Sequence, residues 1–137
     1  MVQEGNFLLD NKNMFCNDTG RIMTGKHLNF LLPVLNSELF FFAVKHFYGG
    51  GGLGSTGIRM KHTFFENFAV PKISSEAQKP FIDLVDQILE ITSTSDYNPK
   101  NPPVKQKELE KQIDELVYKL YDLTEEEIGI IEDSSKE

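Results

Sequence analysis

Apolar residues recur with a helical period in the first half of the chain. Leu28, Leu31, Leu32 and Leu35 follow the i, i+3, i+4, i+7 spacing that places them on one face of a helix. Pro33 interrupts this pattern and indicates either a helix start close by or a kink. Ser37 is a suitable N-cap for a second helix from Glu38 to about Tyr48. That helix is apolar almost all round, so we expect it to be buried on most sides.

The second half of the chain shows two more helical stretches and a break between them. The tetrapeptide 75–78 has the form of a capping box, although Pro80 favours a regular helix that begins a few residues later. Residues 92–105 are rich in Ser, Thr, Asn and Pro and predict a linker. Thr124 and Glu127 form a second capping box that opens a final helix. The two apolar stripes are Phe81, Leu84, Val85, Ile88 and Leu89, and then Leu109, Ile113, Leu116, Val117 and Leu120.

Other segments have the pattern of strands. Between residues 6 and 24, three short apolar runs alternate with Asn/Asp/Gly turn clusters, which predicts a small antiparallel piece of sheet. Ile58, Met60 and His62 alternate with Arg59 and Lys61, so a strand here would place both cations on one face. The predicted fold class is therefore α+β, a small, mostly antiparallel sheet packed with helices and followed by a C-terminal helical segment. The predicted division is an α/β core over residues 1–91, a linker over 92–105, and C-terminal helices over 106–137 that pack on the core.

Composition narrows the class of protein. The chain has 137 residues, of which 39% are hydrophobic, which is typical of one globular domain or part of one. No apolar stretch approaches the roughly 18 to 20 residues of a membrane span, and the N-terminus has no signal-peptide pattern. The single cysteine, Cys16, is expected to be a small buried side chain and fits a reducing compartment. We therefore expect a cytoplasmic protein without a membrane partner.

Charge is unevenly distributed along the chain. The net charge is −7, but residues 1–79 hold eight Lys/Arg against six Asp/Glu, a net charge of +2. Residues 80–137 hold six Lys/Arg against fifteen Asp/Glu, a net charge of −9. An acidic C-terminal part is unsuited to phosphate binding, whereas the first half remains eligible for it.

Two motifs resemble known binding sites but lack their context. Residues 52–57 satisfy G-x-G-x-x-G, yet dinucleotide binding requires that loop between a strand and a helix, and here a Phe-rich helix precedes it. A nucleotide-binding enzyme is thus a minor alternative, which the absence of a thermal shift with NAD, ATP or S-adenosylmethionine would exclude. Residues 101–104 read Asn-Pro-Pro-Val, close to the Asn-Pro-Pro-aromatic tetrad of adenine methyltransferases, but the fourth residue is Val and the tetrad lies in a polar linker.

No catalytic or metal-ligating constellation is present in the sequence. The three histidines and Cys16 do not have metal-ligand spacing, and the carboxylates concentrate on the C-terminal helices. By contrast, cationic and small polar residues bracket the glycine run. Such groups bind phosphates and base edges, so we consider them candidate DNA-binding residues. The set comprises Lys45, His46, Tyr48, Ser55, Thr56, Arg59, Lys61 and His62.

The order of these segments resembles the C-terminal part of the TaqI-like specificity domains. These target recognition domains belong to adenine-specific DNA methyltransferases and fused (type IIG) restriction-modification enzymes. The resemblance covers most of residues 14–131. It rests on Leu35-Asn36-Ser37-Glu38-Leu39, the aromatic helix, the glycine loop leading to residues 58–61, the segment 64–73, the 78–89 helix, and the closing segment 113–128.

The resemblance implies a module that reads double-stranded DNA from the major-groove side while a separate domain flips and methylates adenine. The methyltransferase motifs are missing, so the chain is expected to be a fragment that carries no catalytic residue. S-adenosylmethionine, and Mg²⁺ if the parent cleaves DNA, would bind elsewhere in the parent enzyme. An alternative function is a helical protein-interaction module that docks on a partner or on the missing methyltransferase domain, suggested by the acidic amphipathic stripe from Leu109 to Leu120.

Overall fold

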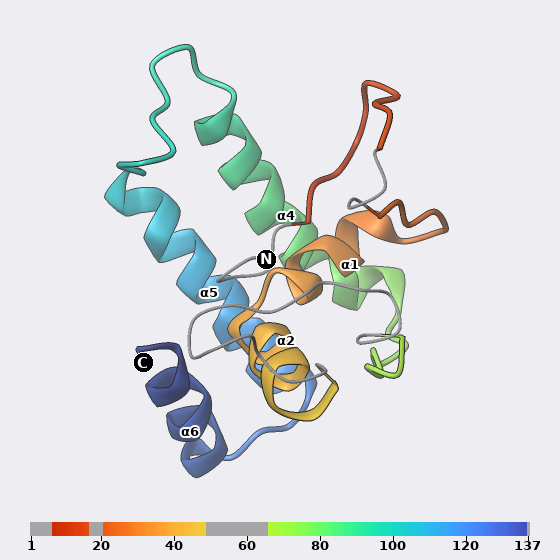
Figure 1. Ribbon diagram of the computed structural model, residues 1–137, viewed down its shortest axis with the longest axis vertical. Helices are drawn as coiled ribbons and strands as arrows, with labels where there is room; N and C mark the ends of the chain where they lie inside the picture. Colours follow the sequence, from red (N-terminus) through yellow and green to blue (C-terminus); the bar gives the residue numbers. More distant parts are fainter. Residues whose placement is uncertain (1–6, 17–20, 49–65, 137) are drawn as a thin grey trace.

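The described part of the chain is helical. The structure, a computed structural model, describes residues 7–16, 21–48 and 66–136, and these contain helices and no strand (Figure 1). A two-turn helix and a short helix with a π-helical extension precede three longer helices. Their bounds are α1, Leu28–Leu35; α2, Glu38–Ala43; η1, Val44–Tyr48; α4, Ser75–Thr92; α5, Val104–Leu120; and α6, Glu125–Ser135.

The predicted α+β class is therefore wrong for the described residues. Residues 7–16 and 21–24 do not form strands, and within 7–16 side chains bond three of the residues whose backbone groups a strand would pair. The Asn36 amide accepts from Phe7 N at 2.9 Å and donates to Phe7 O at 3.0 Å, and the Asp10 carboxylate accepts from the backbone N–H groups of Lys12 and Met14. Such local side-chain bonds compete with a strand ladder. The strand predicted at 58–62 lies outside the described residues.

Most helix boundaries follow the sequence signals. Ser37 caps α2 by accepting from Phe40 N, and Thr124 and Glu127 form the predicted capping box on α6. The helix predicted from Glu38 to about Tyr48 is confirmed, since η1 continues α2 to that residue. The prediction for Pro80 was wrong: α4 starts at Ser75, capped by the Ser74 hydroxyl, and includes the proline.

The main core lies where α1, α4 and α5 meet. Helices α4 and α5 lie side by side, run in opposite directions and are joined by residues 93–103, and α1 packs across them (Figure 1). The Phe30 and Phe81 rings meet edge to face with centroids 5.2 Å apart. The stripe predicted on residues 109–120 faces this core. The buried members of the cluster are Phe30, Val34, Phe81, Val85, Ile113 and Val117.

A second, smaller cluster is organised around α2. Leu35, Phe40 and Val44 are buried in it, and Phe7, Leu31, Phe41 and Phe68 pack against it. Helix α6 lies against α2 and buries Ile131. This cluster joins three parts of the chain that are distant in sequence: the first described residues, α2, and the segment after residue 65.

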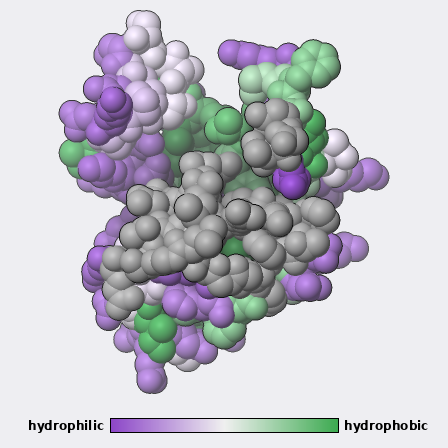
Figure 2. Space-filling view, in the orientation of Figure 1, coloured by the Kyte–Doolittle hydropathy of each residue, from purple (hydrophilic) through white to green (hydrophobic). Residues whose placement is uncertain are grey.

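The N-terminal arm, defined here as residues 8–16 and 21–26, projects from this body. Phe7 holds one end through Asn36 and through its ring contact with Phe40, and His27 at the start of α1 holds the other. The apolar side chains along the arm are exposed, Phe15 fully so, and the outer end of the arm is visible in Figure 2. Cys16 was expected to be buried and is exposed, because the arm does not fold back onto either cluster.

Among the described helices, no single one is long and apolar enough to cross a membrane. The pair Leu28–Leu35 and Glu38–Phe47 reaches the required length and composition only together, with a bend of 61° between the two helices.

Candidate functional site

The segment that follows the basic glycine-rich stretch is held by three aromatic residues, which we call the aromatic anchor: Phe40, Phe68 and Tyr121. The Phe68 ring lies 5.0 Å from the Phe40 ring and 5.6 Å from the Tyr121 ring, centroid to centroid. The Tyr121 hydroxyl donates a hydrogen bond of 2.6 Å to the Ala69 carbonyl oxygen. Residues 68 and 69 are therefore fixed to both α2 and the C-terminal end of α5.

The aromatic anchor brings together the two described segments that lie before and after residues 49–65. Phe40 belongs to α2, which continues through η1 to Tyr48, directly before this stretch. Phe68 and Ala69 follow it closely. The described segments before and after residues 49–65 therefore pack on the same small core.

The predicted DNA-binding residues divide between described and undescribed parts of the chain. Lys45 and His46 lie in η1, and Tyr48 is its last residue. Ser55, Thr56, Arg59, Lys61 and His62 lie outside the described residues, so the structure does not place them relative to Lys45 and His46.

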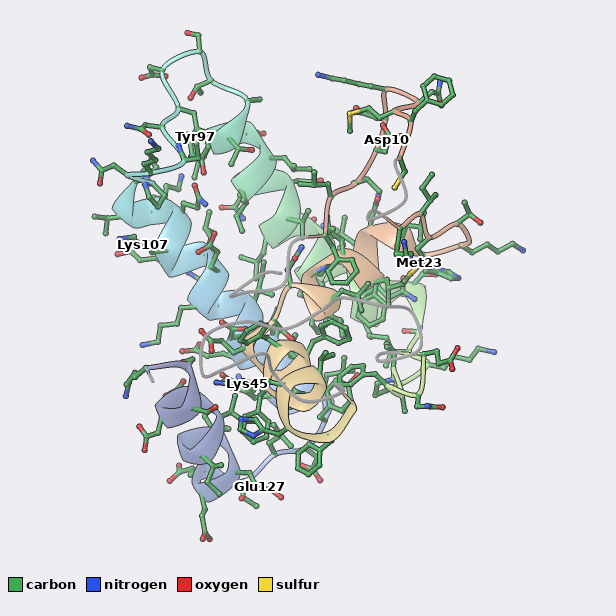
Figure 3. All side chains as sticks on the ribbon, viewed as in Figure 1. Asp10, Met23, Lys45, Tyr97, Lys107 and Glu127 are labelled. Atoms are coloured by element: carbon green, nitrogen blue, oxygen red, sulfur yellow. The ribbon has the colours of Figure 1, made fainter. Side chains whose placement is uncertain are left out.

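His46 has partners inside the fold. Its Nε2 atom lies 3.0 Å from the Ser134 hydroxyl on α6, and its ring lies 4.5 Å from the Phe42 ring. Helix α6 carries five carboxylates and no basic residue. Lys45 is half-buried and lies beside α2 on the side of α6 (Figure 3). The surroundings of these two basic residues therefore contain more carboxylates than their sequence neighbourhood indicates.

A polar cluster that the sequence analysis did not identify lies between α2, α5 and α6. The Asp114 carboxylate, on α5, accepts a hydrogen bond of 2.9 Å from the backbone N–H of Glu38, the first residue of α2. Burial raises the pKa of Asp114 from 3.8 to about 7; the hydrogen bond from Glu38 opposes this, while the nearby carboxylates of Glu38, Glu110 and Glu132 add to it.

Tyr118 lies one turn after Asp114 on the same helix and is 3% exposed. Its hydroxyl has no hydrogen-bond partner among the described residues. Burial raises the pKa of this phenol above its ordinary value, and the charges of Asp114, Glu132 and Glu38 raise it further. The spacing of four residues on one helix face was the only signal in the sequence for this pair.

Other features of the described surface hold fewer functional groups that could bind or react. An open groove of about 390 Å³ runs between the base of the arm, α1 and α4, and Leu9, Leu28, Phe30 and Ile82 are among the residues that line it. Among residues 7–16, 21–48 and 66–136, no group of three or more His, Cys, Asp or Glu side chains could hold a metal ion. In the tetrad 101–104, Pro103 occupies the N-cap position of α5 without a side-chain capping bond, and Val104 begins the helix with an exposed side chain.

Comparisons with protein-family models, with curated proteins and with solved structures gave no match to this chain.

Proposed function

We propose that this chain is the DNA-recognising fragment of a site-specific adenine DNA methyltransferase, or of a fused restriction-modification enzyme. Residues 49–65 would form its DNA contact. The observation that carries the proposal is the aromatic anchor, which holds both flanks of these residues on one core. A segment held at both ends loses less conformational entropy on binding than a free tail.

The distribution of charge also supports residues 49–65 as the DNA contact. Residues 49–65 contain Arg59, Lys61 and His62 and no carboxylate, whereas residues 80–137 have a net charge of −9. DNA would approach the cationic segment and be repelled by α4, α5 and α6. The hydrogen bond between His46 and Ser134 makes His46 a less favourable DNA ligand than Arg59 or Lys61, because phosphate binding would compete with this internal contact. We therefore assign the main phosphate contacts to Arg59 and Lys61.

The salt dependence of DNA binding tests this assignment. The full chain is titrated into a fluorescently labelled duplex pool of random sequence at several salt concentrations, and binding is followed by anisotropy. Each lost phosphate contact flattens the slope of log K against log salt by about 1. Arg59→Ala and Lys61→Ala should each show this loss and weaker binding.

Lys107→Ala and Lys111→Ala are the matched controls, because both lysines are exposed on the acidic helix α5. They should leave the slope unchanged. An equal decrease of the slope in all four variants would mean that the chain attracts DNA only through its charge in general and not through residues 49–65. Wild-type binding by both Arg59→Ala and Lys61→Ala would remove residues 49–65 as the contact.

A second function, a module that docks on the methyltransferase domain of the parent chain, is favoured by the arm. Leu8, Phe15 and Ile22 lie on the arm and expose 82%, 104% and 69% of their surfaces. Covering exposed apolar side chains with a partner is favourable. The stripe from Leu109 to Leu120, which first suggested this function, faces the core. Phe15→Asp and Ile22→Asp should preserve unfolding stability but abolish co-purification with that domain. Unchanged co-purification would exclude the arm as the docking surface.

A further inference from the structure

The N-terminal arm carries most of the large apolar side chains that are exposed in the described part of the chain. Such side chains number ten in that part, and six of them belong to the arm. Phe15 is fully exposed, and Leu8 and Ile22 are more than two-thirds exposed. Covering these side chains is favourable, and neither apolar cluster of the body covers them. The six are Leu8, Leu9, Met14, Phe15, Ile22 and Met23.

A local turn shapes the part of the arm that leads to Phe15. The Asp10 carboxylate accepts hydrogen bonds of 2.8 Å from Lys12 N and 2.9 Å from Met14 N. Asn13 takes the left-handed backbone conformation, with φ of 55°, which asparagine tolerates in turns. The Phe15 N–H that follows donates to no described residue. Phe15 therefore presents an apolar ring beside a free main-chain donor, on a segment that loses less entropy on binding because its turn is already formed.

The groove of about 390 Å³ at the base of the arm has the complementary chemistry. Its apolar lining includes Leu28, Phe30 and Ile82. Gln78 also lines it, is 7% exposed, and donates from Nε2 to Ile73 O at 3.2 Å. Because a carbonyl oxygen only accepts, this bond fixes the orientation of the amide and leaves Oε1 without a donor among the described residues. The groove thus favours a ligand that brings an N–H group together with an apolar side chain.

The positions of the arm and the groove suit a pair of identical chains. Leu9 and Gly25, from the base of the arm, help to line the groove, and Figure 1 shows the arm projecting away from the body. Phe15 lies near the middle of the chain between the two attachments, Phe7 and His27. If two arms lie antiparallel about a two-fold axis, the outer part of each lies beside the base of the other, so both contacts form together.

The apolar surface is also large enough. Interfaces of stable complexes bury about 800 Å² on each partner. The six exposed side chains of the arm, at roughly 100 Å² each, and the groove walls that they would cover amount to an area of this order.

We propose that the arm of one copy docks in the groove of a second copy, with the Phe15 ring between α1 and α4 and the Phe15 N–H donating to Gln78 Oε1. The contact is reciprocal and produces a symmetric homodimer. It does not depend on DNA binding by residues 49–65. Because the dimer occupies the arm, it excludes docking of the same arm on a methyltransferase domain.

Sedimentation equilibrium of the full chain tests the dimer, under reducing conditions so that the exposed Cys16 cannot link two copies. The wild type should change from monomer to dimer as its concentration rises. Phe15→Asp should raise the dimer dissociation constant by about a hundred-fold, because each of two grooves would have to accept a carboxylate. It should leave urea unfolding of the monomer unchanged, since the side chain is fully exposed. Phe47→Asp is the matched control, because Phe47 is 73% exposed on η1, outside the arm, and it should leave the dissociation constant unchanged.

A wild-type chain that stays monomeric up to its highest soluble concentration would overturn the proposal, and the arm would then be left for a different protein. A dimer that Phe15→Asp does not weaken would overturn it as well. A second measurement needs no variant. In a dimer mixed from ¹³C-labelled and unlabelled wild-type chains, isotope-filtered NMR should detect contacts between the Phe15 ring of one copy and the Ile82 methyl groups of the other. A dimer without these contacts would equally overturn it.

Discussion

Tyr118 and Tyr121 are three residues apart on α5 or at its C-cap, yet their hydroxyls have opposite environments. The Tyr121 hydroxyl donates to Ala69 O at 2.6 Å across 52 residues of chain. The Tyr118 hydroxyl is buried without a partner among the described residues. Replacing each tyrosine with phenylalanine removes the hydroxyl and keeps the ring, so the two variants isolate the hydrogen bond from the packing.

The expected changes in the free energy of unfolding have opposite signs. Tyr121→Phe should destabilise the protein by about 1 kcal/mol, the usual net contribution of a neutral hydrogen bond, because the exposed Ala69 carbonyl can then bind water. Tyr118→Phe removes a buried group that has lost its hydration without compensation. It should stabilise the protein by about 1 kcal/mol.

Urea unfolding followed by far-UV circular dichroism measures both values, and the m-value should remain constant. In thermal unfolding, each change corresponds to a shift of about 3 to 5 °C for a chain of this size. Tyr97→Phe is the matched control, because Tyr97 is half-buried in the 93–103 connection and its hydroxyl makes no hydrogen bond with the described residues. Equal destabilisation by Tyr118→Phe and Tyr121→Phe would refute the assignment of the unpaired hydroxyl.

Three further variants test the packing and the caps by urea unfolding. Phe40→Ala should cost about 3 to 5 kcal/mol, since it opens a cavity at a fully buried ring in the aromatic anchor; a loss below about 1 kcal/mol would contradict that packing. Thr124→Ala should cost about 1 kcal/mol through the α6 capping box, whereas Ser93→Ala, beyond the end of α4, should cost less. Asn36→Ala should cost about 1 kcal/mol and increase proteolysis of the arm, and unchanged proteolysis would show that Asn36 does not hold it.

The helices could be predicted from the sequence because their signals are local. A capping serine or threonine and its partner lie within four residues, so Ser37 and the Thr124–Glu127 box predicted the starts of α2 and α6 correctly. The stripe on residues 109–120 also predicted its buried face, since the helical period alone defines which side chains share that face.

The strand predictions failed for an equally physical reason. A strand requires a partner, and the apolar runs near Phe7 and Met14 have the composition of strands but bond to the side chains of Asn36 and Asp10. Whether a short apolar run forms a strand depends on what lies beside it in space, which local composition does not specify. The exposure of Cys16 also depends on the tertiary structure, because the arm that carries it does not pack against either apolar cluster.

The sequence by itself determined the apolar helical stripes, the caps of α2 and α6, and the segregation of negative charge into residues 80–137. The tertiary structure alone decided that Asp114 caps a helix 76 residues away, that Tyr121 holds Ala69, and that Asn36 holds Phe7. Local signals depend on neighbours along the chain, whose geometry is fixed by the backbone. Long-range polar contacts depend on how the apolar faces pack, and that packing raises the pKa of Asp114 by burying its carboxyl and by bringing other carboxylates near it.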